Sequence, residues 1–164
     1  MLHFTVLAAA LATAVVIDVR TRRIPNWLTG ALAAAGLGLS FVGGGPTPAQ
    51  AALGLLAGLL LMMPAHLIGA TGAGDVKLMA AIGAMIGPGL TLRAFVFTAI
   101  AGGVLAVLVA ARRGRLSETV YGTTQLVTAP VSSRPAINDT HRANRFAYGP
   151  AIAIGTLLSL MVTL

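Results

Sequence analysis

Cysteine is absent from the 164 residues, and acidic side chains are scarce, with only four aspartates and glutamates. Without cysteine the chain can form no disulfide, no thiolate zinc site and no cysteine nucleophile. Charged residues make up 9% of the chain, against roughly 25% in a typical soluble domain. That is too little charge to cover a globular surface, so these shortages exclude an ordinary soluble protein.

Hydrophobic residues make up 57% of the chain and are concentrated in six apolar runs. A membrane-spanning helix needs about 20 mostly apolar residues, with a range of roughly 17–25. We therefore predict an all-α integral membrane protein with six transmembrane helices, in which residues 1–164 form a single domain in contact with the lipid bilayer. The predicted helices comprise residues 2–18, 27–42, 51–68, 76–86, 92–111 and 148–164.

Basic residues indicate how these helices are oriented. Ten of the eleven lysines and arginines lie between runs one and two, at the start of run four, or between runs five and six, and Arg93 is the exception. Because lysine and arginine are enriched in cytoplasmic loops, we predict a cytoplasmic polar loop at 112–145 and both termini on the opposite side. No basic residue precedes the first run, which favours a membrane helix over a cleavable signal peptide. The net charge of +7 is distributed around apolar runs, so we expect no nucleic-acid partner.

Two of the four acidic residues lie at the edges of apolar runs. Asp18 ends the first run, and Asp75 ends the motif Gly72-Ala73-Gly74-Asp75 after the third. A carboxylate beside hydrocarbon is unfavourable unless it is paired, protonated or facing water, so both are candidate functional residues. The predicted orientation puts both at cytoplasmic helix ends, at similar depth.

A pair of carboxylates supports a definite chemistry. Two that lie close together tend to share one proton. The charged partner can then deprotonate a water while the protonated one donates a hydrogen bond to a substrate carbonyl, which hydrolyses an amide without metal or cofactor. We expect Gly72 and Gly74 to break the helix before Asp75 and to leave that carboxylate facing a wet cavity.

Three segments resemble the type IV prepilin peptidases, which are intramembrane aspartic proteases of the GxGD type. Asp18-Val19-Arg20 with Arg23-Ile24-Pro25-Asn26 is similar to the first-aspartate signature of that family. The GxGD motif of the family, with its following lysine, is resembled by Gly72-Ala73-Gly74-Asp75-Val76-Lys77. The start of the family's last helix is resembled by Tyr148-Gly149-Pro150-Ala151-Ile152-Ala153. Together, the order and spacing of these segments make the resemblance specific.

The resemblance implies a function and a set of site residues. Asp18 and Asp75 correspond to the catalytic aspartates, and the motifs add supporting or substrate-binding residues at Gly72, Gly74, Lys77, Pro25 and Asn26. Such enzymes remove the basic leader of prepilin-like membrane proteins, after a glycine, at the cytoplasmic face of the bacterial inner membrane. Larger members carry a cysteine-paired zinc segment associated with methylation. This chain lacks that segment, and in this respect it resembles the short branch of the family, which serves tight-adherence (Flp-type) pili.

Two other functions remain open. Another GxGD protease would account for Asp75 but not for the pattern from Asp18 to Asn26. A small proton-coupled transporter would also use paired carboxylates, although it would place them nearer the middle of the membrane.

Individual residues also have structural interpretations. Asp18 can balance Arg20 or Arg22 at a helix end, and Asp75 can be the N-cap of helix four, where it accepts backbone N–H groups. Lys77 can anchor that helix at the interface, Pro25 fits the first turn of helix two, and Asn26 is expected to be structural.

The remaining titratable residues are expected to have simple roles. His66 could join the aspartates at a metal, but no helical ligand spacing supports this, so a packing role is favoured. Glu118 and Asp139 lie in the polar loop, where we expect them to be solvated.

Overall fold

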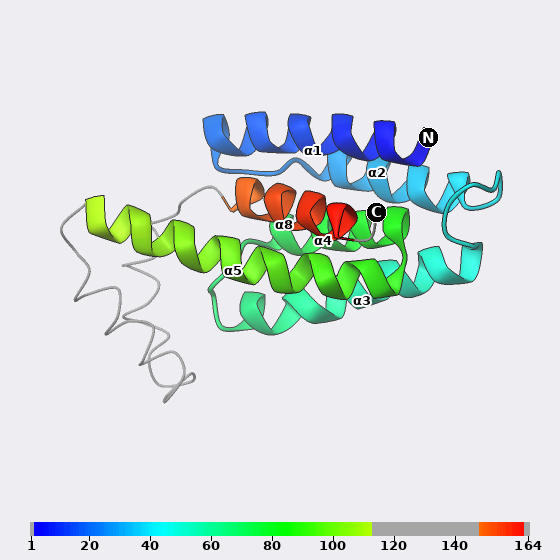
Figure 1. The fold of residues 1–164 in the computed structure, drawn as a ribbon. Coiled ribbons are helices and arrows are strands. Elements are labelled where there is room, and N and C mark those ends of the chain that lie inside the picture. Colours follow the sequence, from blue (N-terminus) through cyan, green and yellow to red (C-terminus); the bar gives the residue numbers. More distant parts are fainter. Residues whose placement is uncertain (1, 113–147, 163–164) are drawn as a thin grey trace.

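The computed structural model describes residues 2–112 and 148–162, and the regular structure within them is entirely helical. The helices of this described part lie side by side, nearly along one axis (Figure 1). They are α1 (Leu2–Thr21), α2 (Asn26–Leu39), α3 (Pro48–Leu67), α4 (Ala73–Ile86), α5 (Pro88–Arg112) and α8 (Gly149–Met161). The all-α prediction is therefore confirmed for these residues. Most of the predicted polar loop, with Glu118 and Asp139, lies outside the described residues.

Proline and local capping set where several helices begin, and they extend the elements beyond the apolar runs. Thr47 and Gln50 form a reciprocal capping box, in which each backbone N–H donates to the other residue's side-chain oxygen. This capping box precedes α3, which starts at Pro48. α5 likewise starts at a proline, Pro88, and at both starts the missing proline N–H needs no partner. Hydropathy alone places these starts three and four residues too late.

Three helices, α1, α3 and α5, are long and apolar enough to cross a membrane. In contrast, α2 and α4 have 14 residues each and α8 has 13. At about 1.5 Å per residue these are roughly 20 Å long, which is shorter than a hydrocarbon core of about 30 Å. Among the described helices, three are thus candidate membrane spans by length and composition, and the arrangement of six spans stays a prediction.

α4 forms the centre of the bundle and packs against all five other helices of the described part. Almost every residue of α4 is buried, including Leu78, Met79 and Ile82 with no exposed surface. The long helices instead expose large apolar side chains, such as Leu60 and Val104. The apolar residues of α4 therefore face protein, whereas the outer helices present an apolar surface suited to lipid.

Glycines bring α3 and α4 into backbone contact. A β-carbon built on Gly54 of α3 would overlap the Gly83 carbonyl of α4, and one built on Gly58 would overlap the Met79 carbonyl. Because lipid tails are as apolar as leucine, membrane helices associate largely through such close packing of small residues. This contact holds α4, and with it Asp75, in the interior.

Substituting Gly54→Ala tests this packing. The added methyl must push α3 away from α4, so we expect a destabilisation of about 1–3 kcal/mol. Differential scanning fluorimetry of the purified protein in detergent should show a lower unfolding temperature. Gly103→Ala is the matched control, because a β-carbon there meets no atom within 4 Å. Equal unfolding temperatures for the two variants would contradict the close contact.

Candidate active site

The end of α1 turns the chain sharply toward α4. Arg22 adopts the left-handed conformation with φ 53°, and its N–H donates to the Asp18 carbonyl at 2.7 Å. Ile24 follows and is buried against Gly74, where a β-carbon would lie only 3.1 Å from the Ile24 Cβ. The segment after Asp18 is thereby packed on the first turn of α4, which carries Asp75.

Asp75 occupies the third position of α4, after an N-cap at Gly72. Its Oδ2 accepts a hydrogen bond from the Gly72 N–H at 3.0 Å. The Asp75 carboxylate thus accepts a backbone N–H at the start of α4, as the capping interpretation expects, but it does so from the third helical position and not from the N-cap. The expectation that both glycines interrupt the helix is wrong for Gly74, which lies in the first helical turn because the helix starts at Ala73.

Asp18 is directed into the bundle and is only 4% exposed. Its Oδ2 accepts a hydrogen bond of 2.7 Å from the N–H of Gly149, the first residue of α8. Arg20 and Arg22 are exposed, so this carboxylate is oriented toward a helix start inside the protein and not toward the surface arginines.

The two carboxylates, those of Asp18 and Asp75, lie within electrostatic range of each other. Each accepts an N–H at the beginning of a helix, where the partial positive charge of the helix dipole favours an anion. Asp18 and Asp75 are both buried, with Asp75 only 9% exposed, and the wet cavity expected beside Asp75 stays a prediction. Because like charges repel, the ionisation of one carboxylate disfavours the ionisation of the other.

Lys77 and Asn26 connect α4 to the start of α2. The Lys77 ammonium donates to Asn26 Oδ1 at 2.8 Å, across 51 residues of sequence, and both side chains are exposed. Pro25 is the N-cap of α2, one position before the predicted first turn, and its carbonyl accepts the Leu28 N–H. These three motif residues hold the turn after Asp18 in place and are not buried with the aspartates.

Two further residues lie near the pair. The Tyr148 phenol is close enough to Asp75 to experience its charge, and its hydroxyl donates to the Thr98 carbonyl at 3.5 Å. His66 also acts electrostatically on Asp75, and its Nδ1 lies 3.1 Å from the Thr71 carbonyl oxygen. Tyr148 begins the third of the three motifs, but no role for it could be predicted from the sequence, because its neighbours in the structure are distant in sequence.

His66 and the aspartates do not assemble into a metal-binding group in the structure. Over residues 2–112 and 148–162, no three histidine or acidic side chains come together in a way that could hold an ion. The histidine instead closes the loop between α3 and α4 through the Thr71 carbonyl. This contact agrees with the packing role favoured from sequence.

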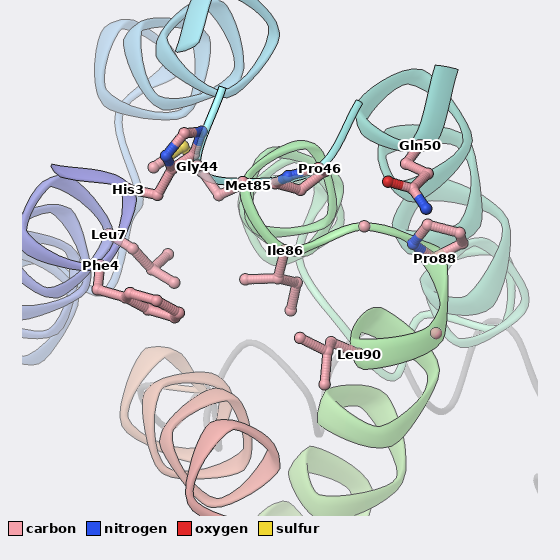
Figure 2. Close-up of a pocket in the computed structure, with 13 residues that line it drawn as sticks. His3, Phe4, Leu7, Gly44, Pro46, Gln50, Met85, Ile86, Pro88 and Leu90 are labelled. Carbon is pink, nitrogen blue, oxygen red and sulfur yellow. The ribbon is translucent and has the colours of Figure 1, made fainter. Parts of the chain in front are cut away.

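A cavity of about 420 Å³ lies at the opposite end of the bundle. Figure 2 shows Phe4, Leu7, Ile86 and Leu90 facing a common space, with His3 beside Gly44. His3 and Asp18 are separated by 15 helical residues, which is about 22 Å at 1.5 Å per residue. The cavity is therefore distinct from the carboxylate pair.

Comparison with known proteins identifies the family. Residues 5–107 match the model of the type IV leader peptidase family. The chain belongs to this family. The matched region includes both aspartates and the complete glycine motif, but not α8. No curated protein and no solved structure matches the chain significantly.

Family membership confirms the resemblance found in the sequence. A leader peptidase is a protease, and the three long apolar helices agree with a protein embedded in a membrane. The leader peptidase therefore accounts for the paired carboxylates better than a proton-coupled transporter does.

Asn26→Ala tests whether the Lys77 contact is structural. Both side chains are exposed, so we expect a destabilisation of about 1 kcal/mol or less and a reduction in cleavage rate of less than about threefold. Asn26→Asp keeps an acceptor for the lysine and should restore stability. Unfolding temperature and cleavage rate are the two measurements. A loss as large as that from replacing Asp75 would instead place Asn26 in the chemistry.

Proposed function

We propose that this leader peptidase is an aspartic endopeptidase in which Asp18 and Asp75 form the catalytic dyad. The proposal is supported by two buried carboxylates, from α1 and α4, each of which accepts a glycine N–H and lies within electrostatic range of the other. The other two acidic residues of the chain, Glu118 and Asp139, are outside the matched region. The proposed dyad therefore consists of the two acidic residues within the matched region.

The proposed reaction needs one proton shared by the dyad. The ionised carboxylate removes a proton from water, and the resulting hydroxide attacks the carbonyl carbon of the peptide bond. The protonated partner donates to the carbonyl oxygen, and a proton then passes to the departing amine as the bond breaks. The glycine donors hold Oδ2 of each carboxylate, so Oδ1 of each is the oxygen that meets water or substrate.

The proposed substrates are prepilin-like membrane proteins. Six helices would cross the inner membrane of a bacterium with both termini in the periplasm, so that Asp18, Asp75 and the neighbouring Arg20 and Lys77 lie at the cytoplasmic face. Cleavage would follow a glycine at the end of a basic leader. The lack of cysteine supports the short tight-adherence (Flp-type) branch, with residues 1–164 forming one transmembrane domain.

Asp18→Asn and Asp75→Asn test the dyad. Each change keeps the shape of the side chain but removes an ionisable group, so each should reduce leader removal by a factor of about 10⁴ or more. The measurement is the size shift of a co-expressed Flp-type prepilin on a gel, with membrane insertion checked by fractionation. Asp139→Asn and Glu118→Gln are matched controls, which should cleave normally. Efficient processing by either dyad variant would rule out the mechanism.

Metal removal is a second test of the same mechanism. Because the two carboxylates activate water themselves, incubation with EDTA followed by dialysis should change the rate less than about twofold. The rate is measured with purified enzyme and a prepilin in detergent. Loss of activity that zinc restores would instead implicate a site built around His66.

A further inference from the structure

The hydrogen bond that orients Asp18 depends on the absence of a side chain at residue 149. Gly149 is buried, and its N–H donates to Asp18 Oδ2 at 2.7 Å. A β-carbon at this position would lie 2.8 Å from that same oxygen and 3.1 Å from the Asp18 Cβ. Any other residue would therefore push the carboxylate away from its donor, and even a small movement of the start of α8 would have the same effect.

Tyr148, the residue before Gly149, packs against Gly102 of α5. A β-carbon on Gly102 would lie 2.5 Å from the hydroxyl oxygen and 2.5 Å from a ring carbon of Tyr148. The aromatic ring thus occupies the space that the glycine leaves. The hydroxyl is 3.5 Å from the Thr98 carbonyl oxygen, near the limit of hydrogen bonding. The ring and its hydroxyl therefore both lie in the space beside Gly102.

A second contact fixes α8 along α5. A β-carbon on Gly155 would overlap Thr98, which is buried one turn before Gly102. The two points of contact, Tyr148 at Gly102 and Gly155 at Thr98, are seven residues apart on α8. Together they prevent α8 from sliding along α5, so α5 determines where the first N–H of α8 lies.

We propose that Tyr148 is a positioning residue, whose ring, seated at Gly102 of α5, places the Gly149 N–H on the Asp18 carboxylate. The proposal rests on the proposed function, because it matters only if Asp18 is catalytic. A hydrogen bond to the charged form of a carboxylate favours that form. Movement of the donor should therefore make Asp18 easier to protonate and leave fewer enzyme molecules active at low pH.

The matched substitutions are Gly102→Ala and Gly103→Ala. They make the same chemical change at adjacent residues of α5, but only the first would push on the Tyr148 ring, since nothing lies within 4 Å of a β-carbon at Gly103. Misplacing a reacting group by about 1 Å costs on the order of 100-fold in rate. We expect Gly102→Ala to lower kcat by about 10- to 100-fold with little change in KM, and Gly103→Ala to match the wild type.

Two variants of the tyrosine separate ring from hydroxyl. Tyr148→Phe keeps the ring and should stay within about threefold of wild-type kcat, whereas Tyr148→Leu should fall as far as Gly102→Ala. In Gly102→Ala and Tyr148→Leu, the acid limb of the plot of kcat/KM against pH should move to higher pH by about one unit. The double variant Gly102→Ala/Tyr148→Leu should be no slower than Tyr148→Leu alone, because both changes disturb one contact.

The assay uses the full-length purified enzyme in detergent with a prepilin substrate, and rates are normalised to the fraction that elutes as folded protein. If Tyr148→Phe were as slow as Tyr148→Leu, the phenol would act chemically and the positioning role would be overturned. Unchanged pH profiles in Gly102→Ala and Tyr148→Leu would overturn it as well. Asp18→Asn is measured alongside: an active Asp18→Asn would refute the proposed function, whereas an inactive one beside normal tyrosine variants would refute only the positioning role.

Discussion

A carboxylate inside an apolar helix bundle needs a hydrogen-bond donor, and this requirement organises the site. Asp75 finds its donor locally, in the N–H of Gly72 at the beginning of its own helix. Asp18 lies near the end of its helix and depends on Gly149, at the beginning of α8. Both donors are at helix starts, where the backbone has unpaired N–H groups and the dipole favours negative charge. The arrangement of α1, α4 and α8 follows from bringing these two starts together.

The central position of α4 makes that arrangement rigid. α4 contacts every other described helix, and Gly54 and Gly83 allow α3 to approach its backbone directly. Asp75 is therefore held by a helix that is buried in protein along most of its length. Asp18 reaches the same region through the tight turn at Arg22 and the packing of Ile24 on the GxGD motif. The bundle cavity lies at the other end of α4, so the two ends of this helix have different surroundings.

Features that depend on nearby residues could be predicted from the sequence. The helical class, both aspartates and the family follow from local motifs and apolar runs, and the structure adds that the aspartates lie within electrostatic range of each other. Hydropathy could not show that α4 is covered by protein, since burial in protein and burial in lipid select the same apolar residues. The helix starts at Pro48 and Pro88 depend on capping, which hydropathy does not measure. The contact of Gly149 with Asp18 spans 131 residues, and no local pattern contains it. No local pattern contains the contact between Tyr148 and Gly102 either.

The distance in sequence between Asp18 and its donor has a consequence for how the enzyme is made. Synthesis proceeds from the N-terminus, so α1 leaves the ribosome first and α8 last among the described helices. Until α8 is inserted beside α5, the Asp18 carboxylate lacks the Gly149 N–H that orients it. The nascent chain therefore carries both aspartates long before it carries a complete site. The proposed dyad is therefore complete only once the last described helix lies beside α5.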